Sequence, residues 1–147
     1  MPTYRPNTDA VIKLDNSVGS LTDVSDYCST ASVDGTASIG MFYVFGETGS
    51  QAAEGKRDVK ASLGVRPATD TTGASASLDG WFFSAAKMGA RTLEIDTPDS
   101  ATGSTRISGE VYLSAWQPIN QDAAGDGTPS TQTASLQYVG IPTRSVL

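Results

Sequence analysis

Short apolar runs alternate along this chain with stretches of small polar residues, a pattern that predicts β-strands joined by turns. Residues 57–65 and 106–117 carry apolar side chains at every second position, as expected for strands with one face on a core. Residues 39–45 (IGMFYVF) are apolar throughout and rich in strand formers, which predicts a buried strand. The full set of predicted strands is 10–14, 29–34, 39–45, 57–65, 91–96, 106–117 and 131–139.

Polar segments separate these strands. Asp34-Gly35 is a turn signal between two of them. Residues 1–8 contain two prolines and predict an extended N-terminal arm, and residues 140–147 predict a short C-terminal tail. Residues 21–27 fit either a helical turn or a short irregular strand. The longest polar segment between early strands has three glycines and no periodicity, which predicts a loop made of Gly46, Glu47, Thr48, Gly49, Ser50, Gln51, Ala52, Ala53, Glu54, Gly55 and Lys56.

Only residues 78–88 show a convincing helical period. Ser77 is a candidate N-cap and Gly89 suits the position after the last turn. Gly80 weakens such a helix by about 1 kcal/mol relative to alanine. Burial of two aromatic side chains outweighs that cost several-fold. The apolar stripe that would face the core consists of Leu78, Trp81, Phe82 and Ala85.

The order of these elements predicts one domain over residues 1–147. Strands, a long loop, a strand, one helix and three closing strands favour a mainly β fold. We therefore expect a β-sandwich or barrel with one α-helix packed on it. No apolar run approaches the ~20 residues that a membrane span needs. The N-terminus also shows no apolar signal region, which argues against Sec-type export.

Composition narrows the chemistry. Histidine is absent and Cys28 is the only cysteine, so His-based triads, His- or thiolate-ligated metal sites and an internal disulfide are all excluded. The formal charge is −6, and the ten cations are spread thinly without a basic footprint for phosphates. We expect no enzyme, no cofactor and no resident metal, and a Cys28 side chain that packs as a small half-buried thiol.

The remaining candidate sites have simpler explanations. The carboxylate pairs Asp23/Asp26 and Glu47/Glu54 fit solvated loop residues better than an acid/base pair. The segment around Asp122 and Asp126 lacks the alternating oxygen ligands and distal Glu of a calcium loop. Tyr112 and Trp116 share one face of a predicted strand. They fit a subunit interface or packing on the outer face of the sheet, or, in an alternative function, the platform of a carbohydrate- or ligand-binding β-sandwich module.

Three segments in order resemble the tail tube proteins of long-tailed phages. Residues 15–27 (DNSVGSLTDVSDY) look like the family's opening turn and short strand. Residues 45–65 (FGETGSQAAEGKRDVKASLGV) look like its loop leading into a strand, and residues 107–116 (ISGEVYLSAW) look like the strand that follows the helix. The likeness spans about residues 9–142, and the order and spacing of the three segments carry it.

The resemblance implies a structural virion protein of the phage tail, made in the host cytoplasm. Such subunits form hexameric rings that stack into a tube through which DNA passes without specific binding. The implied partners are other copies of the chain, a tape-measure protein, a tail terminator and baseplate or tail-tip proteins, with no membrane. Residues 46–56 would be the inter-ring loop, and Glu110 is the candidate for the lumen.

Overall fold

The computed structural model describes residues 9–16, 19–67, 73–84, 87–120 and 131–147. Strands dominate it, as the alternating pattern predicts, and a short 3-10 helix, Ser25–Tyr27, follows the second strand. The elements are β1 (Val11–Asp15), β2 (Leu21–Asp23), β3 (Cys28–Phe42), β4 (Gln51–Val65), α1 (Ala74–Phe82), β5 (Arg91–Thr97), β6 (Thr105–Trp116), β7 (Gln132–Tyr138) and β8 (Thr143–Val146). The expected mainly β fold with one packed helix is confirmed.

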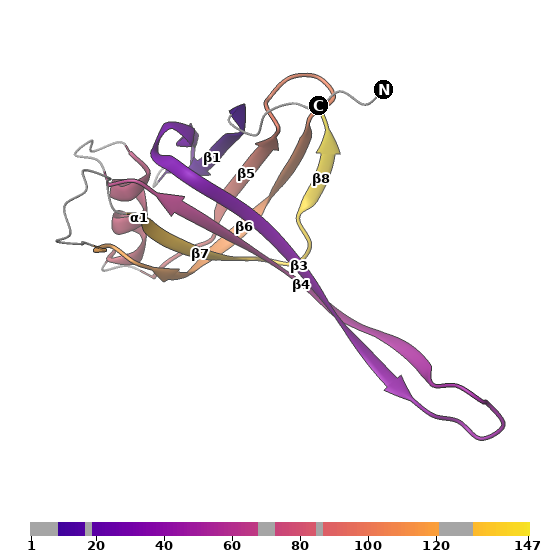
Figure 1. Ribbon diagram of the computed structural model, residues 1–147. Coiled ribbons are helices and arrows are strands. Elements are labelled where there is room, and N and C mark those ends of the chain that lie inside the picture. The colour runs from indigo at the N-terminus through magenta and orange to yellow at the C-terminus, as the bar shows by residue number, and fades with distance from the viewer. Residues whose placement is uncertain (1–8, 17–18, 68–72, 85–86, 121–130) are drawn as a thin grey trace.

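All strands join one antiparallel sheet in the order β2-β1-β5-β6-β7-β4-β3. β6 is its central strand. Its first residues pair with β5 on one edge and with β8 on the other, and residues Val111–Trp116 continue along that second edge with β7. The sheet curves strongly, and α1 lies across its concave side (Figure 1). This arrangement leaves β2 and β3 as the two outermost strands.

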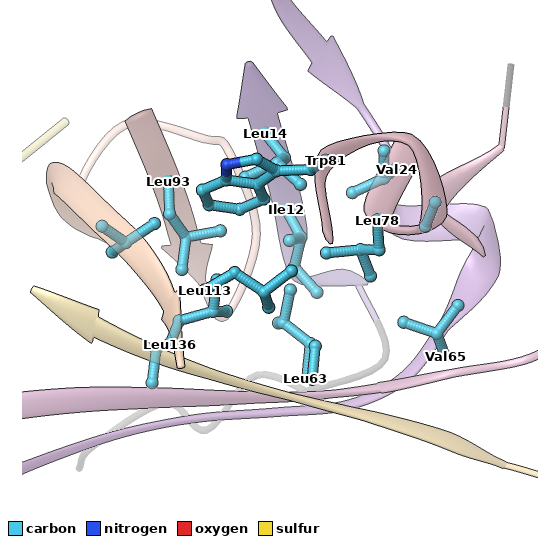
Figure 2. Close-up of a cluster of buried hydrophobic side chains, with 14 of the residues drawn as sticks. Ile12, Leu14, Val24, Leu63, Val65, Leu78, Trp81, Leu93, Leu113 and Leu136 are labelled. Atoms are coloured by element: carbon cyan, nitrogen blue, oxygen red, sulfur yellow. The ribbon is translucent and has the colours of Figure 1, made fainter. Parts of the chain in front are cut away.

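The hydrophobic core fills the space between the curved sheet and α1. Figure 2 shows leucines from five strands meeting Leu78 and Trp81 of the helix. Leu78 is 0% exposed and Trp81 is 2% exposed. Full burial of such a side chain stabilises the fold by roughly 1.5–3 kcal/mol. The strand residues of this cluster that the figure labels are Ile12, Leu14, Leu63, Val65, Leu93, Leu113 and Leu136.

The helix occupies a different range from the predicted 78–88. It starts at Ala74, with Gly73 as N-cap, because Ala74, Leu78 and Trp81 form the buried stripe. It ends at Phe82, after which the Trp81 indole N–H donates a hydrogen bond to the Gly89 carbonyl at 2.9 Å. That bond requires the chain to fold back. Ser77 therefore lies inside the helix, Phe82 is half-buried against the core, and Ala85 lies outside the described residues.

Three strand predictions need correction. The Asp34-Gly35 turn does not form, because both residues pair with β4 within the continuous strand β3. A β-bulge between Leu113 and Ala115 exposes Ala115 and turns Trp116 toward the core. The predicted tail 140–147 contains β8, whose backbone hydrogen bonds complete the free edge of β6. Within the described ranges, the structure has no helix long and apolar enough to cross a membrane.

Candidate assembly interface

β3 and β4 extend beyond the body as a two-stranded hairpin, visible in Figure 1 as the long projection. The pairing of β4 with β7 ends at Lys60, so from that point outward β4 pairs only with β3. We call residues 36–58 the arm. All its residues are exposed except the half-exposed Gln51. An isolated two-stranded ribbon is marginally stable in water, so a solitary arm of this length favours a partner.

A β-bulge interrupts the ladder near the base of the arm. Ala37 pairs with Arg57 and Ile39 pairs with Glu54, so β4 carries one extra residue between these pairs. Gly55 lies in this bulge. A Cβ on Gly55 would be 2.7 Å from the Ser38 carbonyl oxygen, which is backbone and cannot rotate away. Only glycine allows the two strands to approach so closely here, and the bulge increases the local twist of the arm.

The end of the arm is an exposed apolar surface, which we call the apolar tip. Its large side chains are 45–109% exposed, with Phe45 the most exposed. The apolar tip consists of Ile39, Met41, Phe42, Tyr43, Val44 and Phe45. The prediction of a buried strand over residues 39–45 is wrong for the single chain. Within the described part of the chain, only β4 lies beside these residues, and it has small or polar residues opposite them, Gln51 to Glu54. Contiguous exposed apolar surface marks an interaction site.

The predicted loop Gly46–Lys56 is shorter in the structure. Gln51 to Lys56 belong to β4, and Phe42 pairs with Gln51 to close the ladder. The connection is residues 43–50, in which Gly46 adopts a positive φ of 89°. The polar composition of these residues led to the wrong prediction of a loop. They form an exposed strand, which requires backbone pairing but no apolar face. The segment proposed to contact another ring is therefore a hairpin.

The outer edge of β3 is the longest open edge of the sheet. β3 has 15 residues and, among the described residues, pairs on one side only, with β4. Its sequence contains no lysine, arginine or proline, and Asp34 is its single charge. Natural edge strands usually carry such residues to prevent pairing with another chain. β3 lacks this protection. Among the described residues the other open edges are shorter: β2 and β8 have three and four residues, and β4 is open only outward of Lys60, within the arm.

A charged cluster lies on the sheet face opposite the core. Arg106 binds Asp96 through two nitrogens, Nε to Oδ1 at 2.8 Å and Nη2 to Oδ2 at 3.0 Å. Its Nε also lies 3.1 Å from Glu94 Oε1. Asp96 is 0% exposed and Glu94 is 9% exposed. The hydrogen bond to Asp96 raises the pKa of Arg106 further. The sequence analysis did not identify this cluster, because its members come from two strands, with Asp96 and Arg106 ten residues apart in the sequence.

Glu110, the candidate lumen residue, is exposed on the same face of β6 as Arg106. It accepts a hydrogen bond from the Thr92 hydroxyl on β5. Its position in a lumen stays a prediction.

The four carboxylates of the candidate acid/base pairs, Asp23, Asp26, Glu47 and Glu54, are all exposed. Asp23 accepts hydrogen bonds from the backbone N–H and the hydroxyl of Ser25, and these bonds lower its pKa. Glu47 lies in the arm connection and Glu54 in β4. Burial raises the pKa of the Cys28 thiol to about 11, so thiolate chemistry is disfavoured. Asp122 and Asp126 lie outside the described residues. The described part of the chain shows no metal-binding group of three His, Cys, Asp or Glu residues.

The structure contradicts the alternative in which the aromatic side chains of Tyr112 and Trp116 form a ligand-stacking platform. The bulge in β6 separates the faces of Tyr112 and Trp116. Tyr112 is 49% exposed, whereas Trp116 is 8% exposed and donates its indole N–H to Asp79 Oδ1 at 2.6 Å. Trp116 therefore fastens α1 to β6 and is not available to stack on a sugar.

Solved structures share this fold over nearly the whole chain. A chain from the tail of an empty gene transfer agent particle with C6 symmetry matches with a TM-score of 0.67 and 13% identity, covering 98% of this chain and 99% of that one. The SPP1 tail tube chain matches at 0.69 and 10%, covering 95% and 78%. A chain of the PVC sheath–tube complex, an extracellular contractile injection system, matches at 0.65 and 12%, covering 97% and 91%. No protein-family model and no curated protein matches the sequence.

Proposed function

We propose that this protein is the structural subunit of a phage-type tail tube. Six copies form a ring, rings stack into a hollow tube, and DNA travels through the tube into the host. The tail of the virion is then its location. The chain shares its fold with tail and tube chains along nearly its full length, and one of those assemblies has C6 symmetry.

The observation that carries the proposal is the open edge of β3. β3 is paired with β4 on one side, and the other edge of this 15-residue strand, which has no proline, lysine or arginine, offers a long template for strand addition. When β3 meets an edge strand of a neighbouring copy, both sheets gain the hydrogen bonds that each lacks alone. Six copies joined in this way close into one continuous barrel, which removes the open edges altogether.

The arm supplies the second contact, between rings. Its exposed apolar tip needs cover, and it projects well beyond the body of its own subunit (Figure 1). A head-to-tail contact of this kind repeats without limit along one axis and produces a filament. The tail terminator, the baseplate or tail-tip proteins and the tape-measure protein are the partners that such a tube requires at its ends and in its lumen.

Charge suits a conduit for DNA. The formal charge of −6 and the absence of a basic cluster favour weak contact with phosphates. DNA therefore slides past without being held. The proposed role requires no reaction chemistry, and the structure offers no observation that favours the carbohydrate- or ligand-binding alternative.

Assembly of the purified protein tests the proposal. The sample is concentrated stepwise, with and without the initiating tail complex, and followed by sedimentation and negative-stain imaging. We expect rings or tubes with a central hole. A monomer at every concentration, with no tube even after seeding, would contradict the proposed function.

A further inference from the structure

A groove opens where the start of β3 passes the ends of β1 and β5. Its volume is about 730 Å³. Ile12 and Ile95 line it and are only 5% and 6% exposed, so they form an apolar floor. Cys28 and Ala31 of β3 contribute to its wall. None of the lining residues is charged, although 18% of the chain is.

The groove and the apolar tip lie toward opposite ends of β3. The groove uses residues 28–31, and the tip begins at Ile39. Ile39 lies eight positions after Ala31 along the extended strand, which is roughly 26 Å at ~3.3 Å per residue. β3 is paired with β4 throughout this stretch, so the tip cannot fold back onto the groove of its own chain. Each copy therefore presents a donor at one end and an acceptor at the other.

We propose that the groove receives the apolar tip of a second copy of this chain. The inference rests on the proposed tube function and names the receptor for the arm. Both surfaces are uncharged, and they are complementary in form: the tip projects large side chains without cover, and the groove is a hollow without an occupant among the described residues. The volume is within the ~300–1,000 Å³ range of pockets that enclose a ligand of several rings.

The donor–acceptor geometry has a consequence for assembly. Because the two surfaces differ, the contact is heterologous and leaves a free tip and a free groove after every addition. Rings then add one after another in a single polarity. A contact between two tips would instead close on itself and stop at a pair of rings.

The single cysteine makes this contact directly testable. Cys28 lines the groove, and a Phe45→Cys substitution places a second thiol in the tip. Tubes of this variant are treated with a mild oxidant at pH 8–9, where the exposed thiol at position 45 supplies the reactive thiolate, and run on a non-reducing gel. We expect a ladder of trimers and longer species, since each chain carries two different reactive positions. Peptide mapping should identify residue 28 joined to residue 45.

A matched double variant, Phe45→Cys with Cys28→Ser, has one thiol per chain and should yield dimers at most. A second measurement avoids thiols. Ala31→Arg introduces a cation at the groove wall, whereas Ser32→Arg introduces the same charge on the opposite face of β3. Both positions are exposed, so both variants should fold. We expect Ala31→Arg to abolish stacking of rings and Ser32→Arg to retain it.

The outcomes separate this inference from the proposed function. Tubes with the 28–45 link and the Ala31→Arg defect support the groove as the receptor. Tubes without that link, or with equal behaviour of the two arginine variants, overturn the groove and leave the tube function standing. Failure of the wild-type protein to form any ring or tube overturns both.

Discussion

Arg106 holds Asp96 through two hydrogen bonds on the face of the sheet that is opposite to the hydrophobic core. Asp96 is fully buried, so the guanidinium is the group that compensates its charge. A buried carboxylate deprived of its partner strongly destabilises a fold. The core covers one face of β5, and on the other face the ion pair with Arg106 compensates the buried carboxylate. Arg106 therefore has a structural role.

Arg106→Ala should lower the urea midpoint of unfolding well below that of Arg144→Ala, which removes a single long hydrogen bond to Thr105. Arg106→Lys should fall between wild type and Arg106→Ala, because lysine keeps the charge and loses the paired geometry. Circular dichroism of the monomeric subunit measures all three. Equal midpoints for the two alanine variants would contradict a structural role for the cluster.

The opposite faces of Tyr112 and Trp116 give a second prediction. Trp116→Ala removes a buried ring and its hydrogen bond to Asp79, and should cost about 3–5 kcal/mol of unfolding free energy. Tyr112→Ala changes an exposed side chain and should stay within about 0.5 kcal/mol. Denaturant titration of both variants decides the matter. A small effect at Trp116 together with loss of glycan binding would restore the discarded platform.

Tyr138 gives a dependence on alkaline pH. Burial raises its pKa to about 12 from 10, and its hydroxyl has no hydrogen-bond partner within the described residues. Between pH 10 and 12 the unfolded chain releases this proton and the folded chain retains it, so stability falls as pH rises through that window. The loss is about 2–3 kcal/mol in total.

Tyr138→Phe should abolish that part of the alkaline loss and raise stability near pH 7 by about 1 kcal/mol, because a buried hydroxyl without a partner is removed. Cys28 titrates in an overlapping range, with a pKa of about 11, so both proteins are compared in a Cys28→Ala background. Parallel stability curves for tyrosine and phenylalanine above pH 10 would show that the phenol is not buried.

The apolar tip should matter for assembly and not for folding. Replacing Met41, Tyr43 and Phe45 with serine removes side chains that touch solvent, so the melting temperature of the subunit should change little. Tube formation should be lost. Val139→Ser with Ile141→Ser is the control, since these residues are also exposed apolar residues but lie on the body. Normal tubes from the triple variant would show that the arm does not join rings.

Substitution of Gly55 tests whether the stability of the arm depends on glycine at the β-bulge. Gly55→Ala forces a Cβ against the Ser38 carbonyl, whereas Gly40→Ala meets nothing closer than 3.9 Å. Arm amides should exchange hydrogen about tenfold faster in Gly55→Ala, the change that a loss of ~1.4 kcal/mol produces. Gly40→Ala should exchange at nearly the wild-type rate. Identical exchange in the two variants would mean that the bulge relaxes without cost.

The apolar pattern of the sequence correctly predicted those elements whose apolar side chains are buried within the same chain. β4 places Ala61, Leu63 and Val65 in the core as its pattern indicates, and α1 buries Leu78 and Trp81. The helix limits were wrong because Ala74 extends the stripe and the Trp81–Gly89 hydrogen bond ends it. Neither feature could be recognised in the sequence, because small residues precede and follow the apolar stripe.

The arm was misread for a different reason. Residues 39–45 are apolar, and an apolar sequence does not distinguish burial in the core of the same chain from burial against another chain. The polar stretch 51–56 forms a strand through backbone pairing alone, which composition does not reveal. Trp116 lies on the opposite face from the one predicted because of a one-residue β-bulge, and no residue type near the bulge indicates its presence.

The central claim is that copies of this protein complete one another's sheets, with the open edge of β3 as the main template. A six-fold averaged cryo-EM map of assembled tubes measures this directly. We expect β3 of each subunit to run about 4.7–4.9 Å from a strand of its neighbour, within a continuous barrel around a lumen. A map of tubes in which the β3 edge faces solvent, or is capped by a segment of its own chain, would contradict the account.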